Sequence, residues 1–125
     1  PWFWAMAGGS FVRHPKLQEF SMQVVDRKHP STAHLGEKWV WTDEFYFLRD
    51  MPAGLHVLLA GELGSLNDPK KPTDEATRPL AWCHVFEGGR CWFTTLGHRK
   101  EAYADPVFQQ HILGGILWAM NRKLP

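Results

Sequence analysis

The residues best suited to chemistry follow the predicted strand over residues 90–96, where Gly97 and His98 are succeeded by Glu101 and Tyr103. Gly97 permits a tight exit from the strand, so that His98 begins a polar loop. Because an imidazole titrates near neutral pH and a neighbouring carboxylate fixes its tautomer and raises its basicity, His98 with Glu101 suits general acid–base catalysis. In the alternative interpretation, His98 caps the following helix or bonds a backbone carbonyl.

A second set of candidates would contact a substrate. Trp82 and His84 are two residues apart in a predicted strand and therefore share a face, where an indole and an imidazole could form a sugar-binding wall. His84 could equally be a hydrogen-bonded core residue. Asp43 and Glu44 could pair as acids or orient a ligand, although acids at the start of a strand are commonly just solvated. His14, which the following proline holds extended, is also a candidate.

The same side chains define a metal-binding alternative. A divalent ion would be held by His14, His84 and His98 together with Asp43 or Glu44. No HExxH or CxxC spacing accompanies them, so only the fold could assemble such a site. We therefore predict no cofactor and keep a divalent metal as the alternative.

A β-hairpin is predicted to carry most of these residues. Residues 79–86 and 90–96 are aromatic-rich runs separated by Glu87-Gly88-Gly89, in which glycine supplies the positive φ of a tight turn. With the turn at Gly88-Gly89, Cys83 and Cys91 are not opposite each other, and a disulfide between them is disfavoured.

A helix is predicted after the hairpin. Asp105 is a favourable N-cap and Pro106 suits the first helical position. Gly114 and Gly115 each cost about 1 kcal/mol of helix propensity, for which a close approach of the helix to a sheet is the expected compensation. The apolar stripe of this helix consists of Phe108, Ile112, Ile116 and Met120, flanked by Leu113 and Leu117.

The rest of the chain predicts shorter elements. Residues 55–60 are apolar apart from one histidine, as in a central strand that needs cover on both faces. Residues 61–78 are predicted to be a surface loop long enough to border a site. We also expect a short helix over residues 2–7, a strand over residues 17–26, and a short strand over residues 45–47 that the acids Asp43 and Glu44 precede.

Composition limits the partners. The 125 residues suffice for one domain, and the net charge of +1 comes from 14 basic and 13 acidic residues scattered along the chain. The sequence has no basic stripe that would grip nucleic acid and no apolar run near the length of a membrane span, so neither partner is expected. Two free cysteines favour a reducing compartment, and we predict a cytoplasmic location.

Several runs resemble the C-terminal signature of the trehalose-utilisation (ThuA-like) family: PLAWCH at 79–84, GRCWFTTLGH at 89–98, EAY at 101–103, DPVF at 105–108 and HILGGILWA at 111–119. The resemblance implies an α/β fold similar to class I glutamine amidotransferases, a flavodoxin-like three-layer sandwich, here with a mixed sheet. Only residues 105–122 read as a full-length helix, whereas a doubly wound sheet needs helices on both faces. We therefore interpret residues 1–125 as the C-terminal part of a single ThuA-like domain that lacks its N-terminal strands and elbow.

The family resemblance also implies a role in carbohydrate metabolism. An enzyme of hydrolase or isomerase type would act on a disaccharide, a glycoside or an oxidised sugar derivative, with His98 as acid/base, Glu101 as its orienting partner, and Trp82 and His84 in the sugar wall. The alternative is a non-catalytic sugar-binding or interaction module on the same scaffold. A small-molecule sugar is the expected partner, and the chain could also associate as a homo-oligomer.

Overall fold

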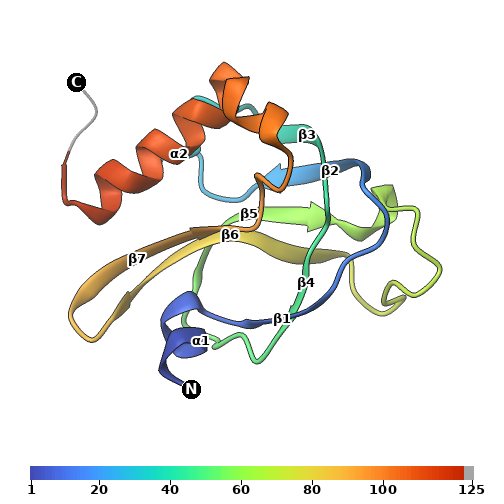
Figure 1. Cartoon of the computed structure of the whole chain (residues 1–125), viewed down its shortest axis with the longest axis horizontal. Coiled ribbons are helices and arrows are strands. Elements are labelled where there is room, and N and C mark those ends of the chain that lie inside the picture. The colour runs from blue at the N-terminus through green and yellow to red at the C-terminus, as the bar shows by residue number, and fades with distance from the viewer. Residues whose placement is uncertain (123–125) are drawn as a thin grey trace.

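A curled antiparallel sheet of five strands, in the order β3-β2-β5-β6-β7, organises the computed structural model, which describes residues 1–122 (Figure 1). Its strands are β2 (Gln18–Val24), β3 (Lys38–Asp43), β5 (His56–Glu62), β6 (Thr77–Phe86) and β7 (Gly89–Thr94). A separate antiparallel pair consists of β1 (Ser10–Arg13) and β4 (Phe47–Arg49). The helices are α1 (Trp2–Ala7) and α2 (Pro106–Ala119), with short 3-10 turns η1 (Leu63–Ser65) and η2 (Lys100–Ala104).

The mixed sheet that we expected is wrong, because every strand pairing among residues 1–122 is antiparallel. A parallel pair needs a long crossover, usually through a helix. Between the start of β2 and the end of β7 the chain forms no helix except the short η1 turn. The fold is therefore mixed α/β, and the described residues do not show flavodoxin-like layering.

The predicted hairpin is confirmed as β6 and β7, but its turn lies one residue earlier than expected. Glu87 and Gly88 both have positive φ, 47° and 80°, as a two-residue type I′ turn requires. The register consequently places Cys83 opposite Trp92 rather than opposite Thr94. Cys83 and Cys91 are both free, as predicted.

The strand near the two acids also differs from our expectation. The alternation of buried Trp39 and Trp41 with exposed Val40 forms β3, which pairs with β2 and ends at Asp43. The strand β4 begins only at Phe47. The acids therefore follow a strand, whereas we had placed them before one.

The central strand is confirmed, since β5 lies between β2 and β6. Three consecutive residues at its middle, Leu58, Leu59 and Ala60, are buried, so both faces are covered. Among the described residues, no helix combines the length and the apolar character needed to cross a membrane.

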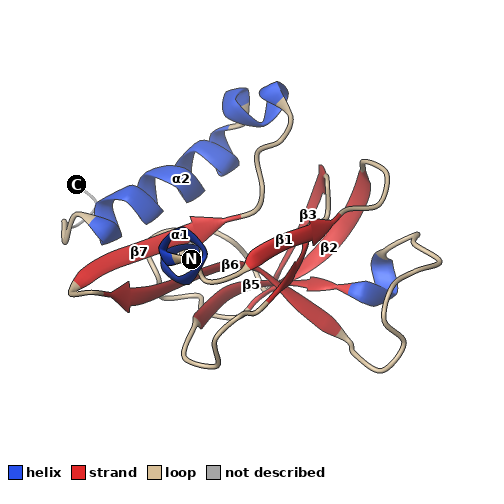
Figure 2. Ribbon diagram, turned by 60° about the horizontal axis from the view of Figure 1, so that its bottom comes forward, coloured by secondary structure: helices blue, strands red, loops and turns tan. Residues whose placement is uncertain are grey.

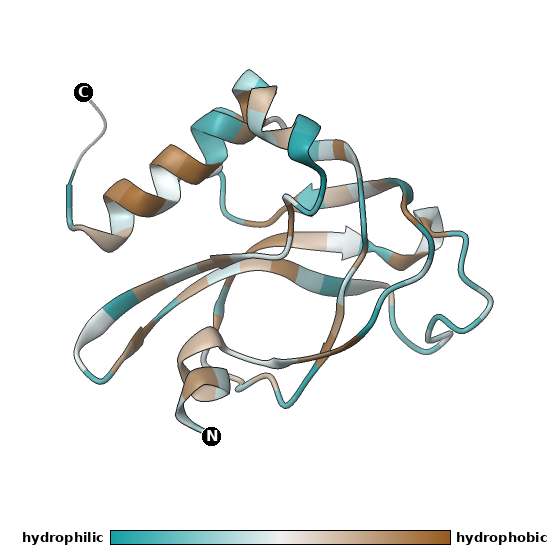
Figure 3. Cartoon of the chain, in the orientation of Figure 1, coloured by the Kyte–Doolittle hydropathy of each residue, from teal (hydrophilic) through white to brown (hydrophobic). Residues whose placement is uncertain are grey.

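Helix α2 begins as predicted but buries a different face. Asp105 is its N-cap and accepts from the backbone N–H groups of the next turn. Its buried residues are Phe108, His111, Gly114 and Gly115, whereas Leu113, Ile116 and Met120 of the predicted stripe are exposed. Figure 3 shows hydrophobic residues recurring along the helix. The two glycines decide the packing face, because their lack of side chains allows the closest approach.

The close approach that we inferred from the two glycines is confirmed. A Cβ at Gly114 would lie 2.2 Å from the carbonyl oxygen of Pro30, and one at Gly115 would lie 2.2 Å from the Trp92 ring. Figure 2 shows α2 running alongside β7, which carries Trp92. The helix thus fits against one face of the β6–β7 hairpin and against the turn that contains Pro30.

Helix α1 covers the other face of the same hairpin. Its C-terminal residue is followed by Gly8 in the left-handed conformation, with φ of 88°. Trp82 Nε1 donates to the Ala7 carbonyl at 2.9 Å, and the His84 ring bonds the Met6 carbonyl at 2.7 Å. Because Trp82 and His84 alternate with Cys83, which pairs with Trp92, α1 and α2 lie on opposite faces.

Replacing Gly114 by alanine tests this packing. Alanine favours a helix over glycine by about 1 kcal/mol, yet the new Cβ would collide with the backbone of Pro30, which no side-chain rotation relieves. We expect Gly114→Ala to destabilise the protein by about 1–3 kcal/mol, as overpacking does, measured by denaturant unfolding. Gly64→Ala is the control, since a Cβ there meets no atom within 4 Å. A Gly114→Ala protein as stable as wild type would contradict the close contact.

Candidate functional site

Two histidines converge on the carboxylate of Glu44. Its Oε2 lies 3.2 Å from His98 Nδ1 and 3.6 Å from His14 Nε2. His14 directly follows β1, Glu44 directly follows β3, and His98 lies four residues after β7. Three segments far apart in the sequence thus place one acid and two imidazoles together.

The side chain of Asp43 connects the segments that carry Glu44 and His98 through hydrogen bonds. It is fully buried, and its Oδ2 accepts from the backbone N–H of Gly97 at 2.7 Å and from Trp41 Nε1 at 3.0 Å. Its Oδ1 accepts from the backbone N–H of Glu44 at 2.9 Å. Since buried carboxylates are expensive unless hydrogen-bonded, these contacts make Asp43 a structural tie between the end of β3 and the loop that carries His98.

The contacts of the two histidines orient their rings. Nδ1 is the nitrogen of His98 that faces Glu44, and a neutral ring with its proton on Nδ1 would leave Nε2 as a basic site. His14 Nδ1–H donates to the Pro15 carbonyl at 2.8 Å, so its Nε2 faces Glu44. The His98 side chain is 50% exposed and Glu44 is 14% exposed, so the imidazole is accessible while its partner is largely sheltered.

The phenol of Tyr46 also lies at Glu44, although no sequence pattern described above singled it out. Burial and a hydrogen bond to Glu44 raise the pKa of its phenol, and the Glu44 and Asp43 charges act in the same direction. Its ring lies 4.9 Å from that of Phe11, edge to face. Tyr46 therefore remains a neutral O–H group beside Glu44.

His98 is one of the residues that line an aromatic groove of about 340 Å³. Trp82, which is buried, forms part of its wall and stacks against Phe93 with ring centroids 6.3 Å apart. Because aromatic rings offer flat apolar surfaces, the groove can receive the C–H face of a ring-shaped ligand. Its aromatic side chains are Phe3, Trp4, Phe11, Tyr46, Trp82 and Phe93.

Two other residues predicted for the site, Glu101 and His84, are not among the residues that contact Glu44 or line the aromatic groove. Glu101 is exposed in η2, whereas the carboxylate within ion-pair distance of His98 is that of Glu44. His84 shares a strand face with Trp82, as predicted, but lines a different cavity. In residues 1–122, no group of three or more His, Cys, Asp or Glu side chains is arranged to hold a metal ion.

Comparison with known proteins identifies the family. The family model described as trehalose utilisation, ThuA, matches residues 1–119. The chain therefore belongs to the ThuA family, which associates it with carbohydrate use in general terms and specifies no reaction. No curated protein matches the chain.

Two crystal structures of proteins described as ThuA-like share the fold. One, from Bacteroides uniformis, is 22% identical with a TM-score of 0.72, over 95% of this chain and 51% of that one. The other, from Parabacteroides merdae, is 25% identical with a TM-score of 0.59, over 94% of this chain and 44% of that one. The chain thus spans about half the length of the solved structures that it matches.

The structural role of Asp43 predicts a large effect on stability. Asp43→Ala would leave the N–H groups of Gly97, Trp41 and Glu44 without their acceptor, and each buried unsatisfied donor costs about 1–3 kcal/mol. We therefore expect Asp43→Ala to lower the melting temperature far more than Glu44→Ala, the adjacent and more exposed acid. Equal effects in thermal unfolding would show that Asp43 does not tie the two segments together.

Proposed function

We propose that this chain supplies the acid–base centre of a ThuA-like enzyme that acts on a sugar derivative. The observation that carries the proposal is the contact between His98 Nδ1 and Glu44 Oε2 at 3.2 Å, with His98 lining the aromatic groove. An imidazole whose second nitrogen is held by a carboxylate is suited to accept and return a proton.

The proposed proton transfer uses both nitrogens of His98. The Nε2 lone pair takes a proton from the substrate, and the imidazolium that forms keeps its Nδ1–H on Glu44. The negative charge of Glu44 stabilises this cation without accepting the proton. His98 then returns the proton from Nε2 to another atom of the substrate. The hydroxyl of Tyr46 donates to Glu44 and holds the carboxylate in place.

An oxidised sugar fits this centre better than a plain one. A carbonyl group acidifies the adjacent C–H bond, so a positioned imidazole can remove that proton. Most glycoside hydrolases instead use two carboxylates that flank the scissile bond. Asp43 cannot be the second carboxylate beside Glu44, because it is fully buried and accepts from three N–H groups. We therefore favour isomerase-type or elimination chemistry on a keto-sugar.

The aromatic lining of the groove favours a second candidate function, a sugar-binding module without turnover. In that case the aromatic rings would stack on the sugar, and Glu44 with the two histidines would only hydrogen-bond its hydroxyl groups. Both functions predict binding, and only the first predicts conversion of the substrate.

Substitutions at the acid–base pair distinguish the two functions. With a panel of keto-disaccharides and the matching plain disaccharides, His98→Ala is expected to lower kcat by about 10²–10⁴-fold, the usual contribution of a general acid–base group. Its melting temperature should barely change, because the side chain is half exposed. Glu44→Gln should lower kcat in the same direction, whereas the charge-matched control Glu101→Gln should leave it unchanged.

Two results would overturn the enzymatic proposal. Binding of the panel with no turnover by the wild-type protein would support the sugar-binding module. Turnover that persists in folded His98→Ala protein would show that His98 does not transfer the proton.

A further inference from the structure

A cleft of about 780 Å³ lies between the loop that joins β1 to β2 and the loop that follows η1. It shares no lining residue with the aromatic groove. Its lining includes the side chains of Arg13, Lys16 and Lys70, and we call it the basic cleft.

The basic cleft carries two positive charges that no carboxylate balances. Asp68 is the one acid among the described residues that line it, and its Oδ2 accepts from the Arg13 guanidinium at 2.8 Å. Burial raises the pKa of Asp68, but the hydrogen bonds and charges of Arg13 and Lys70 outweigh it and leave the pKa lowered, so Asp68 is charged and balances Arg13. Within residues 1–122, no carboxylate lies within 4 Å of the ammonium group of Lys16 or Lys70.

Hydrogen bonds fix the two loops that carry these lysines. Gln18 Nε2 donates to the Lys16 carbonyl at 3.0 Å and to the Asn67 carbonyl at 3.2 Å. Gln18 Oε1 accepts from the backbone N–H of Asn67 at 2.7 Å. Arg13 also donates to the Lys70 carbonyl at 2.9 Å. The backbone beside each lysine is therefore held in place, and a ligand would have to order only the two lysine side chains.

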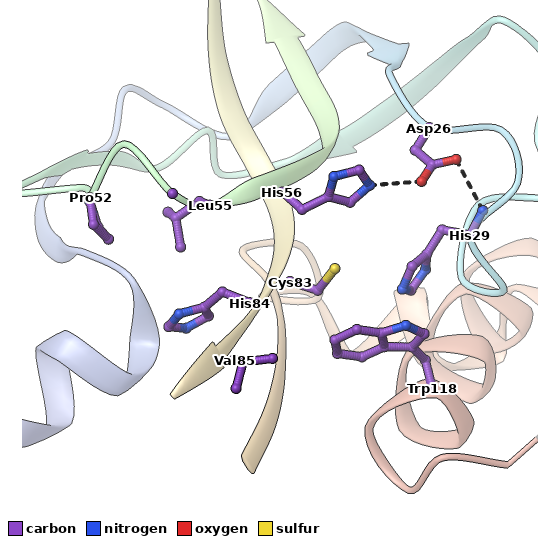
Figure 4. A pocket seen from close by; sticks show the side chains of 10 residues that line it. Asp26, His29, Pro52, Leu55, His56, Cys83, His84, Val85 and Trp118 are labelled. Carbon is purple, nitrogen blue, oxygen red and sulfur yellow. Dashed lines mark hydrogen bonds and ion pairs between the residues drawn. The ribbon is translucent and has the colours of Figure 1, made fainter. Parts of the chain in front are cut away.

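The cationic lining distinguishes this cleft from two other cavities. Among the described residues, no lysine or arginine lines the aromatic groove or the cavity of about 480 Å³ between β5, β6 and the end of α2. Figure 4 shows that second cavity, where the Asp26 carboxylate bonds His56 at 2.7 Å. Because a cleft lined by one sign of charge concentrates ligands of the opposite sign, the basic cleft selects an anion.

The two ammonium groups match the oxygens of a phosphate or a carboxylate. Each lysine offers three N–H donors and a compact positive charge, and lysine is a common ligand of phosphate groups. A carboxylate presents the same kind of acceptor with less negative charge. Lys16 and Lys70 come from different loops, so one oxyanion between them can accept from both.

His14 connects the basic cleft to the acid–base centre. It lines the cleft, and its Nε2 lies 3.6 Å from Glu44 Oε2. Glu44 itself is not among the residues that line the cleft. An oxyanion bound in the cleft would therefore lie next to the acid–base centre without sharing a wall with its carboxylate.

We propose that the basic cleft binds the oxyanion group of a small-molecule ligand, a phosphate or a carboxylate, between Lys16 and Lys70. The site adjoins the acid–base centre, but the proposal does not depend on the function of that centre.

Titration with inorganic phosphate and with D-glucuronate, followed by NMR, tests the two sources of an oxyanion. We expect saturable shifts of the backbone amides of Gln18 and Asn67 with at least one probe, and the probe that binds identifies the group. D-Glucose, the neutral counterpart of glucuronate, should leave these amides unshifted. The double variant Lys16→Gln/Lys70→Gln should weaken binding by about tenfold or more, because it removes both unbalanced charges. Both lysines are exposed, so this variant should remain folded.

Two controls keep the result specific. Arg27→Gln/Lys28→Gln removes two positive charges from exposed residues that follow the other end of β2, and it should bind as wild type does. His98→Ala should also bind both probes as wild type does, which separates the cleft from the acid–base function. The absence of a saturable shift with either probe, or equal weakening in the two double variants, would overturn the proposal.

Discussion

The buried carboxylate of Asp43 is the constraint on which the site depends. Its two oxygens accept from a backbone N–H at the end of β3, from a tryptophan side chain of the same strand, and from Gly97, which is 54 residues away. Gly97 adopts a φ of 103° there, which suits glycine best. These hydrogen bonds join the segment that follows β3 to the segment that follows β7. They therefore bring Glu44 and His98 close together independently of the contact between those two side chains.

The β6–β7 hairpin carries the rest of the architecture, since each of its faces receives one helix. On the α1 face, Trp82 lines the aromatic groove and bonds the helix. On the α2 face, Gly115 packs against Trp92, while Gly114 packs against the turn at Pro30. Fully buried His111 connects α2 to its surroundings, through the Ser31 carbonyl at 2.8 Å and the Thr94 hydroxyl at 3.1 Å. Burial lowers the pKa of His111 to about 4, so it is a neutral structural histidine.

Local sequence patterns predicted the helices and strands. The arrangement of the candidate site depends instead on contacts between segments that are far apart in the sequence. The hairpin, the N-cap at Asp105 and the central strand β5 follow from turn chemistry, capping and hydropathy, which act over a few residues. The sequence placed His98, Glu44 and His14 among the candidates but paired His98 with Glu101. Glu101 is near His98 in sequence, yet η2 leaves it exposed, whereas Glu44 reaches His98 through sheet topology.

The central claim is that Glu44 holds His98 in the tautomer that makes Nε2 basic. Long-range ¹H–¹⁵N NMR of the His98 ring tests it most directly, since it reports which nitrogen carries the proton. We predict that the neutral ring is protonated at Nδ1 in the wild-type protein and loses this preference in Glu44→Gln. A neutral ring protonated at Nε2, or a tautomer that does not respond to Glu44→Gln, would contradict the account.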